Sequence, residues 1–138
     1  MASPRVERLE RTYSEMNQGR LDEALAIADP AIVWQTPTAF PGAPRFHSRD
    51  EVVAFFTEVL RSVDELRIEV ESYDERGDQV LVVQRHFMRG AASGIDTERR
   101  MAHLWRFEGD RAVEFEAFHD VDEAVAEMER RETGEKRE

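Results

Sequence analysis

Several residue types are absent or scarce in this chain of 138 residues, and each gap excludes a class of chemistry. The chain has no cysteine, which excludes disulfides, thiol nucleophiles and cysteine-based zinc sites. Lys136 is its single lysine and lies in the tail, so Schiff-base chemistry and a phosphate-loop lysine are excluded as well. No apolar run reaches membrane-spanning length, and the N-terminus lacks the pattern of a signal peptide. We therefore expect a soluble, cytoplasmic protein.

Acidic residues outnumber basic ones by 30 to 19, which gives a net charge of −11. Such a field repels phosphate backbones and anionic membrane surfaces, and the sequence shows no local basic patch that would overcome it. We expect neither a nucleic-acid partner nor a membrane partner. The length fits one domain, which we place at residues 1–130, followed by a charged tail at 131–138 that lacks apolar anchors and is expected to fray.

The first half of the chain is predicted to form helices around one short strand. Ser3 before Pro4 is typical of a helix start, and Gly19 of a helix end. Ser48 and Glu51 have the spacing of a capping box. The patterns predict, in order, a helix from Pro4, a short helix over about 21–28 ended by Asp29 and Pro30, a strand over 32–34, a loop broken by Pro37, Pro41, Gly42 and Pro44, and a helix after Ser48 with Val52, Phe55, Phe56, Val59 and Leu60 on its buried face.

Alternation of apolar and polar residues predicts strands in the second half of the chain. Leu66, Ile68 and Val70 alternate with charged residues, and turns at Gly77 and Gly109 separate later strands. The predicted strands lie at about 66–70, 79–88, 98–107 and 112–119, and Asp120 with Glu123 caps a closing helix. Helices on one face of an antiparallel meander define an α+β fold.

The last two strands distinguish an inner from an outer sheet face by the parity of their residues. The odd positions are expected to face inward: Met101, His103, Trp105, Phe107, Val113, Phe115, Ala117 and His119. On the strand at 79–88 two sets compete, and the set Val80, Val82, Gln84 and His86 is favoured for the inner face over Leu81, Val83, Arg85 and Phe87.

The outer face is expected to be charged, with Arg100, Arg106, Glu114 and Glu116 at even positions. Leu104 and Phe118 lie among these charges. Apolar residues on a charged face suggest a covering partner, for which a homodimer through the outer sheet face is the simplest prediction. The closing helix is the alternative cover.

Five stretches of the sequence resemble one known family: Tyr13–Leu21, Ala31–Trp34, Ser48–Phe56, Trp105–Asp110 and Phe118–Asp120. In this order they resemble the SnoaL-like branch of the nuclear transport factor 2-like superfamily, over roughly residues 5–128. The resemblance implies a curved, mixed-to-antiparallel sheet wrapped around N-terminal helices, forming a cone with one apolar cavity and often a dimer. The superfamily includes ketosteroid isomerases, polyketide cyclases, dehydratases, epoxide hydrolases and members without known activity, so the fold alone assigns no function.

The family's catalytic residues transfer to this chain only in part. The resemblance places the general-base aspartate of the isomerases at Gln35, or at Thr36 with a slip of one residue, and neither accepts a proton. Tyr13 lies one residue from their oxyanion tyrosine, and His103 takes the place of their protonated aspartic acid. In the polyketide cyclases a histidine at this position works with a second aspartate, for which this chain has Ala117.

His103 is therefore the predicted catalytic residue, which would carry a proton or polarise a substrate oxygen. His86 and His119 also face inward by parity, and two histidines on adjacent strands can divide these roles. The predicted cavity residues are Tyr13, Trp34, Gln35, Phe55, His86, Trp105, Phe115 and His119, with Gln84 as a further candidate to orient a ligand. The alternative for the histidines and the aromatic residues is plain core packing. No inward carboxylate joins the histidines, so we expect neither a metal nor a cofactor.

Two functions follow as hypotheses. The first is a cofactor-free isomerase, cyclase or dehydratase that acts on a small hydrophobic molecule by proton transfer. The second is a non-catalytic module of the same fold for small-molecule binding or dimerisation, which the missing aspartates favour. The sequence leaves open which of them applies and whether the chain is an enzyme.

Overall fold

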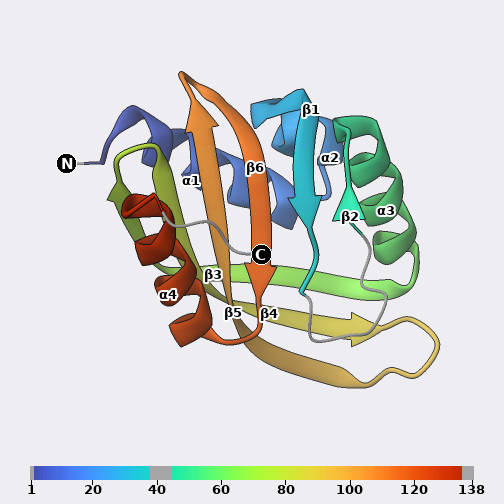
Figure 1. Ribbon diagram of the computed structural model, residues 1–138. Helices are drawn as coiled ribbons and strands as arrows, with labels where there is room; N and C mark the ends of the chain where they lie inside the picture. The colour runs from blue at the N-terminus through green and yellow to red at the C-terminus, as the bar shows by residue number, and fades with distance from the viewer. Residues whose placement is uncertain (1, 38–44, 135–138) are drawn as a thin grey trace.

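The protein is built on one curved sheet with helices on both of its faces (Figure 1). The computed structural model describes residues 2–37 and 45–134. Helices α1, α2 and α3 lie against the concave face, and α4 lies against the convex face. No helix in these two ranges has the length and apolar composition needed to cross a membrane. The described elements are α1 (Pro4–Asn17), α2 (Leu21–Ala24), the 3₁₀ helix η1 (Leu25–Ile27), β1 (Ala28–Gln35), β2 (Arg45–Phe46), α3 (Arg49–Arg61), β3 (Val63–Arg76), β4 (Gln79–Gly90), β5 (Asp96–Glu108), β6 (Arg111–Phe118) and α4 (Val121–Glu132).

The described strands form one sheet in the order β2-β1-β6-β5-β4-β3. Neighbours are antiparallel except for β1 and β6, which run parallel, so the sheet is mixed, as expected. In Figure 1, β3 and β4 sweep across one end of the molecule and cross the direction of β1 and β6. This curvature wraps the sheet around the N-terminal helices, as the resemblance implied.

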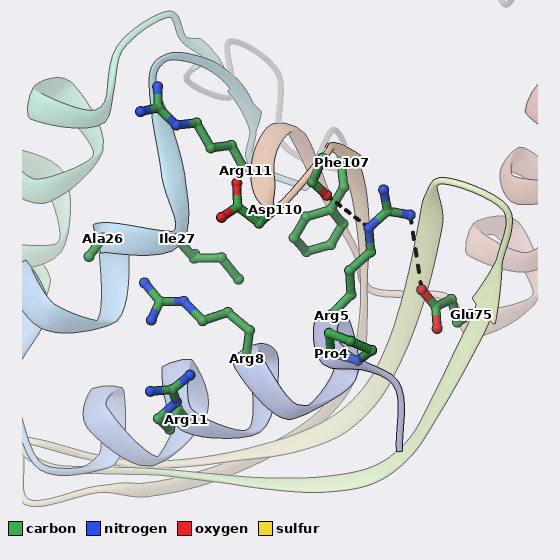
Figure 2. A pocket seen from close by; sticks show the side chains of 11 residues that line it. Pro4, Arg5, Arg8, Arg11, Ala26, Ile27, Glu75, Phe107, Asp110 and Arg111 are labelled. Carbon is green, nitrogen blue, oxygen red and sulfur yellow. Dashed lines mark hydrogen bonds and ion pairs between the residues drawn. The ribbon is translucent and has the colours of Figure 1, made fainter. Parts of the chain in front are cut away.

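The predicted start of α1 is confirmed and is tied to the sheet. Ser3 Oγ accepts a hydrogen bond from the Val6 backbone N–H at 3.2 Å. Arg5 donates to the carbonyl oxygens of Gly77 and Gly109, each at 3.1 Å. Figure 2 shows Arg5 between Phe107 and Glu75. Both glycines have positive φ and form the turns of the two hairpins, as predicted. One side chain thus fixes the helix start against two hairpins.

Asn17, the last residue of α1, binds the open edge of β3. Its side-chain amide donates to the Ile68 carbonyl oxygen at 2.9 Å, and its side-chain oxygen accepts from the Ile68 N–H at 2.6 Å. β3 is the last strand of the described sheet, so these bonds satisfy backbone groups that no neighbouring strand pairs. Both ends of α1 are therefore held to the sheet by side-chain hydrogen bonds.

The second helix is shorter, and the first strand longer, than predicted. α2 ends at Ala24 and continues as η1 to Ile27, and β1 already begins at Ala28. Pro30 therefore lies within a strand and does not end a helix. The ladder to β6 is irregular between Ala28 and Val33, so the missing N–H of the proline falls where the ladder is interrupted. The two-residue strand β2 had no sequence signal.

The capping box at the start of α3 is confirmed. Ser48 Oγ accepts from the Glu51 N–H, and the Glu51 carboxylate accepts from the Ser48 hydroxyl, both at 3.2 Å. Of the predicted apolar face only Val52 is buried. Phe55 and Phe56 are half-buried because they face a cavity. Apart from Pro37, the predicted loop that precedes this helix lies outside the described residues.

The favoured parity of β4 is confirmed by its register with β5. Val82 lies opposite His103, and opposed residues of an antiparallel pair share a face. Val80 and Val82 accordingly belong to the main core on the concave face, whereas Leu81 packs on the convex face.

One inward prediction on β6 needs correction. A bulge next to Phe107 pairs that residue with Ala112. Ala112 therefore enters the main core, and Val113, which was expected to face inward, stays partly exposed.

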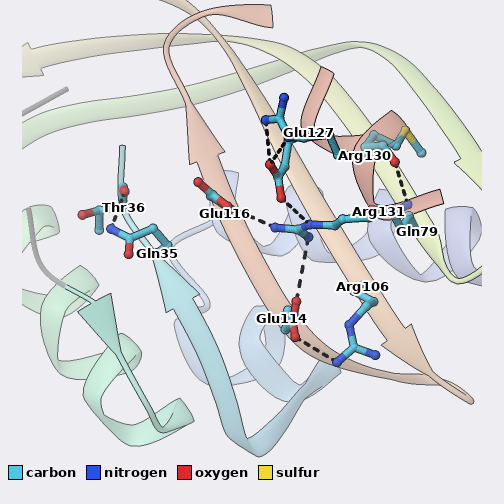
Figure 3. A network of polar contacts seen from close by, with 10 residues as sticks. Gln35, Thr36, Gln79, Arg106, Glu114, Glu116, Glu127, Arg130 and Arg131 are labelled. Atoms are coloured by element: carbon cyan, nitrogen blue, oxygen red, sulfur yellow. Dashed lines mark hydrogen bonds and ion pairs between the residues drawn. The ribbon is translucent and has the colours of Figure 1, made fainter. Parts of the chain in front are cut away.

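The chain's own closing helix covers the apolar residues of the convex face. Leu104 and Phe118 form a second apolar cluster with α4. A network of charged side chains holds this helix in place (Figure 3). Arg131 donates to Glu127 at 2.9 Å and to Glu116 at 3.1 Å. The homodimer stays a prediction, but the apolar residues that suggested it already have a cover.

The same network also includes Arg131, the first residue of the tail that was expected to fray over residues 131–138. α4 continues through Arg130 and Arg131 to Glu132, because both arginines bind carboxylates of the helix or the sheet. Residues 135–138 lie outside the described part of the chain.

Candidate functional site

A cavity of about 600 Å³ lies between the concave sheet face and helices α1 and α3. This volume is within the range of small-molecule sites. Most of its lining is aliphatic or aromatic. The lining residues are Thr12, Tyr13, Met16, Leu25, Trp34, Thr36, Pro37, Phe55, Phe56, Val59, Leu66, Ile68, His86, Met88, Arg99, Met101, His103, Trp105, Phe115, Ala117 and His119.

Each predicted site residue except Gln35 and the further candidate Gln84 lines this cavity. Gln35 pairs in register with Glu116 of the convex face, and its side-chain amide donates to the Thr36 carbonyl oxygen at 2.9 Å (Figure 3). Thr36 lines the cavity instead. The alternative with a slip of one residue therefore describes this strand correctly, because a shift by one residue moves a side chain to the other face.

A chain of hydrogen bonds joins three side chains of the cavity wall. Trp105 Nε1 donates to the Tyr13 hydroxyl at 3.0 Å, and this hydroxyl lies 2.8 Å from His103 Nδ1. An indole N–H only donates, so Tyr13 is its acceptor. The indole N–H and the Tyr13 O–H both find an acceptor when the Tyr13 O–H donates to Nδ1, which leaves the proton of neutral His103 on Nε2. His103 then offers an N–H donor to a molecule in the cavity.

Burial keeps these groups neutral at pH 7. Desolvation lowers the pKa of His103 well below its usual value, and the neighbouring His86 adds to this effect. Desolvation, with a smaller contribution from His119, lowers the pKa of His86 to about 4. Desolvation likewise raises the pKa of Tyr13 well above its usual value. The site therefore presents hydrogen-bonding groups without a formal charge.

Aromatic packing fixes the walls around the three-residue chain. Trp34 stacks on Phe115 with ring centroids 3.7 Å apart, and its ring meets Trp105 edge-on at 5.6 Å. His103 lies edge-on to Phe115 at 4.7 Å and to His86 at 5.5 Å. Trp34 and Phe115 are both almost fully buried, so they serve as core residues and as cavity wall together.

Arg99 is the site residue that sequence reasoning missed. It lines the cavity and is the only permanently charged side chain among the described lining residues. It lies near His119. The pKa of His119 is lowered mainly by desolvation and to a smaller extent by the charge of Arg99. Its odd position on β5 was the available signal, since it continues the inward series of Met101 and His103.

Gln84 is fully buried, yet it is not among the lining residues. Neither polar atom of its side-chain amide has a hydrogen-bond partner among the described residues. It lies on the concave face, because it is opposite Met101 in the register. The expectation that it orients a ligand therefore has no direct contact to support it.

The arrangement can donate a hydrogen bond to a ligand oxygen, but it has no carboxylate base. No aspartate or glutamate is among the described residues that line the cavity. Nor do three or more potential metal-binding side chains converge anywhere in residues 2–37 and 45–134. The chemistry available to the chain's own residues is hydrogen bonding and proton transfer by neutral histidines.

The fold is shared with several solved structures. A nuclear transport factor 2-like protein of unknown function from Burkholderia pseudomallei has 26% sequence identity and a TM-score of 0.77, over 91% of this chain and 97% of that chain. A proposed SnoaL-like polyketide cyclase from Jannaschia has 18% identity and a TM-score of 0.74, over 91% and 94%. TerC, co-crystallised with polyporic acid, has 17% identity and a TM-score of 0.75, over 90% and 97%.

Sequence comparison identifies the family directly. A search of curated proteins found no significant match. The family model of the SnoaL-like domain, however, matches residues 9–115, which include α1 from Leu9 onward, both tryptophans and His103. Because this match covers most of the chain, and the structure has the corresponding fold, the chain belongs to the SnoaL-like domain family.

Proposed function

We propose that the cavity binds a small, largely apolar compound with a carbonyl or hydroxyl oxygen, and that the chain catalyses its isomerisation, cyclisation or dehydration by proton transfer without a cofactor. The observation that carries this proposal is the chain from Trp105 through Tyr13 to His103. It places one oriented N–H donor in a cavity whose lining is mostly aliphatic and aromatic. Such a donor stabilises negative charge that develops on a ligand oxygen.

His103 acts as the oxyanion donor in this proposal. Its Nδ1 is occupied by Tyr13, so its Nε2–H is the group left for the ligand. The hydrogen bond from Tyr13 fixes both the orientation of the His103 ring and its tautomer. A neutral imidazole is a suitable donor because it has no charge that water must solvate.

His86 is the proton acceptor in this proposal. Its ring lies edge-on to that of His103, and its Nε2 is buried without a hydrogen-bond partner among the described residues. A pKa of about 4 makes it a weak base at pH 7. It therefore suits a substrate whose C–H group is already acidified by an adjacent carbonyl.

A non-catalytic binding module is the second candidate function. The absence of a carboxylate among the described lining residues favours it, since the family's known bases are aspartates. Two structural neighbours support small-molecule binding in general: TerC was co-crystallised with polyporic acid, and the Jannaschia protein is described as a proposed polyketide cyclase.

Matched ligands distinguish these functions. 2-Tetralone and tetralin have the same fused-ring size, but only the ketone has an oxygen and acidic α-protons. We expect the ketone to bind about tenfold more tightly, the value of one good hydrogen bond, and to exchange its α-protons in D₂O, measured by NMR. Binding without exchange would leave the module as the function. Equal binding of both compounds would refute the role of His103.

Two variants localise the effect. His103→Phe is expected to abolish the preference for the ketone. His47→Phe is the matched control, because His47 is exposed and does not line the cavity. An unchanged preference in the His103 variant would contradict the proposal, provided its circular dichroism spectrum shows that it is folded.

A further inference from the structure

A second pocket, of about 610 Å³, lies outside the cavity and shares none of its lining residues. It is formed by the first turns of α1, by η1, and by the hairpins that follow β3 and β5. Arg5, Arg8, Arg11 and Arg111 line it, and we call it the arginine pocket. The chain has a net charge of −11, so a pocket lined by four arginines is locally opposite in charge to the chain as a whole.

Two of the four arginines already have partners within the protein. Arg5 donates to backbone carbonyls and lies 4.0 Å from Glu75, and Arg111 forms an ion pair with Asp29 at 3.4 Å. Arg5 also lies over the ring of Phe107, 5.4 Å from its centroid. These two side chains therefore frame the pocket and are committed to the fold.

Arg8 and Arg11 are different, because neither has a hydrogen bond or an ion pair with any described residue. Figure 2 shows the Arg8 side chain extending across the pocket towards Ile27. With Arg5 they recur every third residue along α1, so three like charges are neighbours on one helix near its positive end. These charges would attract an anion placed in the pocket.

Asp110 limits what kind of anion fits. It lines the same pocket, Figure 2 shows it opposite Arg8, and it has no partner among the described residues. A carboxylate repels a bare anion but accepts hydrogen bonds from hydroxyl groups. The pocket volume suits a small molecule, and the charge of the whole chain disfavours a polyanion such as nucleic acid.

We propose that the arginine pocket binds a small hydroxylated oxyanion, a sugar phosphate or a sugar acid, with Arg8 and Arg11 on the anionic group and Asp110 on a hydroxyl. Arg5 and Arg111 are paired with Glu75 and Asp29, so Arg8 and Arg11 against Asp110 leave an excess of one positive charge for such a ligand. Guanidinium groups bind phosphate and carboxylate through paired N–H donors. This site is independent of the function proposed for the cavity.

Isothermal titration calorimetry of the full chain tests the proposal with four probes. Glucose 6-phosphate and gluconate represent the two oxyanions, inorganic phosphate is the anion without hydroxyls, and glucose is the neutral control. We expect glucose 6-phosphate, gluconate or both to bind with a Kd below about 1 mM, and glucose not to bind. The two anions decide between phosphate and carboxylate. Failure of both to bind, or equal binding of glucose, would overturn the proposal.

Charge-matched variants identify the site. Arg8→Gln with Arg11→Gln is expected to weaken binding at least about tenfold, because charge-assisted hydrogen bonds are lost. Arg20→Gln with Arg45→Gln removes the same charge from exposed positions outside the pocket and is expected to change the Kd less than about twofold at physiological salt. Equal losses in both double variants would show a general charge effect and overturn the site.

Asp110→Asn tests the hydroxyl contact. It is expected to strengthen the binding of inorganic phosphate, because the repulsion by the carboxylate disappears. It is also expected to reduce the difference in affinity between glucose 6-phosphate and phosphate, because an amide is a weaker acceptor for the sugar hydroxyl. Phosphate that binds the unmodified chain as tightly as glucose 6-phosphate would remove the hydroxylated class from the proposal.

Discussion

The two faces of the sheet stabilise buried polar side chains in opposite ways. On the concave face, His86, His103 and Tyr13 are neutral and lie among aromatic rings without a carboxylate in the described lining. On the convex face, Glu116 and Glu127 are buried as well, but arginine side chains hold them under α4. Burial therefore does not decide whether a group is charged; the partner that the opposite layer supplies does.

This difference predicts different costs when one partner is removed. A buried carboxylate that loses its arginine must either stay charged without a partner or take up a proton, and both states cost free energy near pH 7. A neutral hydroxyl or imidazole loses only a hydrogen bond. The concave face is thus expected to tolerate substitution better than the convex face.

The largest effect is expected on the convex face from Arg131→Met. The substitution leaves the Glu116 carboxylate, which is 4% exposed, without its ion pair to this arginine, and we expect unfolding to become about 3 kcal/mol easier. Urea denaturation measures the change. Arg100→Met is the matched control, because its pair with Glu71 is exposed and contributes little to stability. Equal losses would show that α4 is not held by the buried network.

A smaller loss is expected on the concave face from Tyr13→Phe. This variant removes the hydroxyl that accepts from Trp105 and contacts His103 Nδ1, at a cost of about 2 kcal/mol because a buried indole N–H is left unpaired. It also frees the tautomer of His103. Ligand affinity should therefore fall together with stability, whereas Arg131→Met should leave the affinity of folded protein unchanged.

The pH dependence of stability follows from the burial of His86 on the same face. The folded-state pKa of His86 is about 4, below its usual 6.5, so the unfolded chain binds a proton first as the pH falls. Stability from this residue is fully present above pH 6.5 and is lost between pH 6.5 and about 4, at up to about 1.4 kcal/mol per pH unit. His86→Phe should make the melting temperature depend less on pH in this window than it does in the unmodified chain. An identical slope in both proteins would contradict the burial of a neutral His86.

The smallest effect is expected from Gln84→Met, and it has the opposite sign. The amide of Gln84 is buried without a partner among the described residues, so an apolar side chain of similar volume should raise stability by about 1 kcal/mol. Thermal denaturation checks it. A loss of stability would mean that an ordered water binds this amide.

Much of the fold follows from local sequence signals. Ser3 and the pair Ser48 and Glu51 mark helix starts through bonds within one turn, and Gly77 and Gly109 mark turns that need positive φ. Such signals involve few neighbours and are therefore visible in the sequence. The early start of β1, the strand β2 and the full length of α4 depend on partners far along the chain, such as Glu116 for Arg131. No local pattern shows these partners.

The candidate site divides in the same way. Strand parity and the family resemblance identified His103 and Tyr13, and the structure brings them within 2.8 Å. The same parity extended by one step would have given Arg99. The resemblance left Gln35 and Thr36 open, because it does not fix a register to one residue. The arginine pocket was invisible, since Arg8 and Arg111 meet only through the packing of α1 against a hairpin.

The two hydrogen bonds between Asn17 and Ile68 affect how the molecule associates with other chains. β3 is fourteen residues long and ends the described sheet, and a long open edge is a template on which another chain can add a strand. A carboxamide that both donates and accepts at mid-strand imitates the backbone of such a chain and occupies its place. Loss of this single side chain should therefore cause aggregation at high protein concentration while the fold itself is still intact.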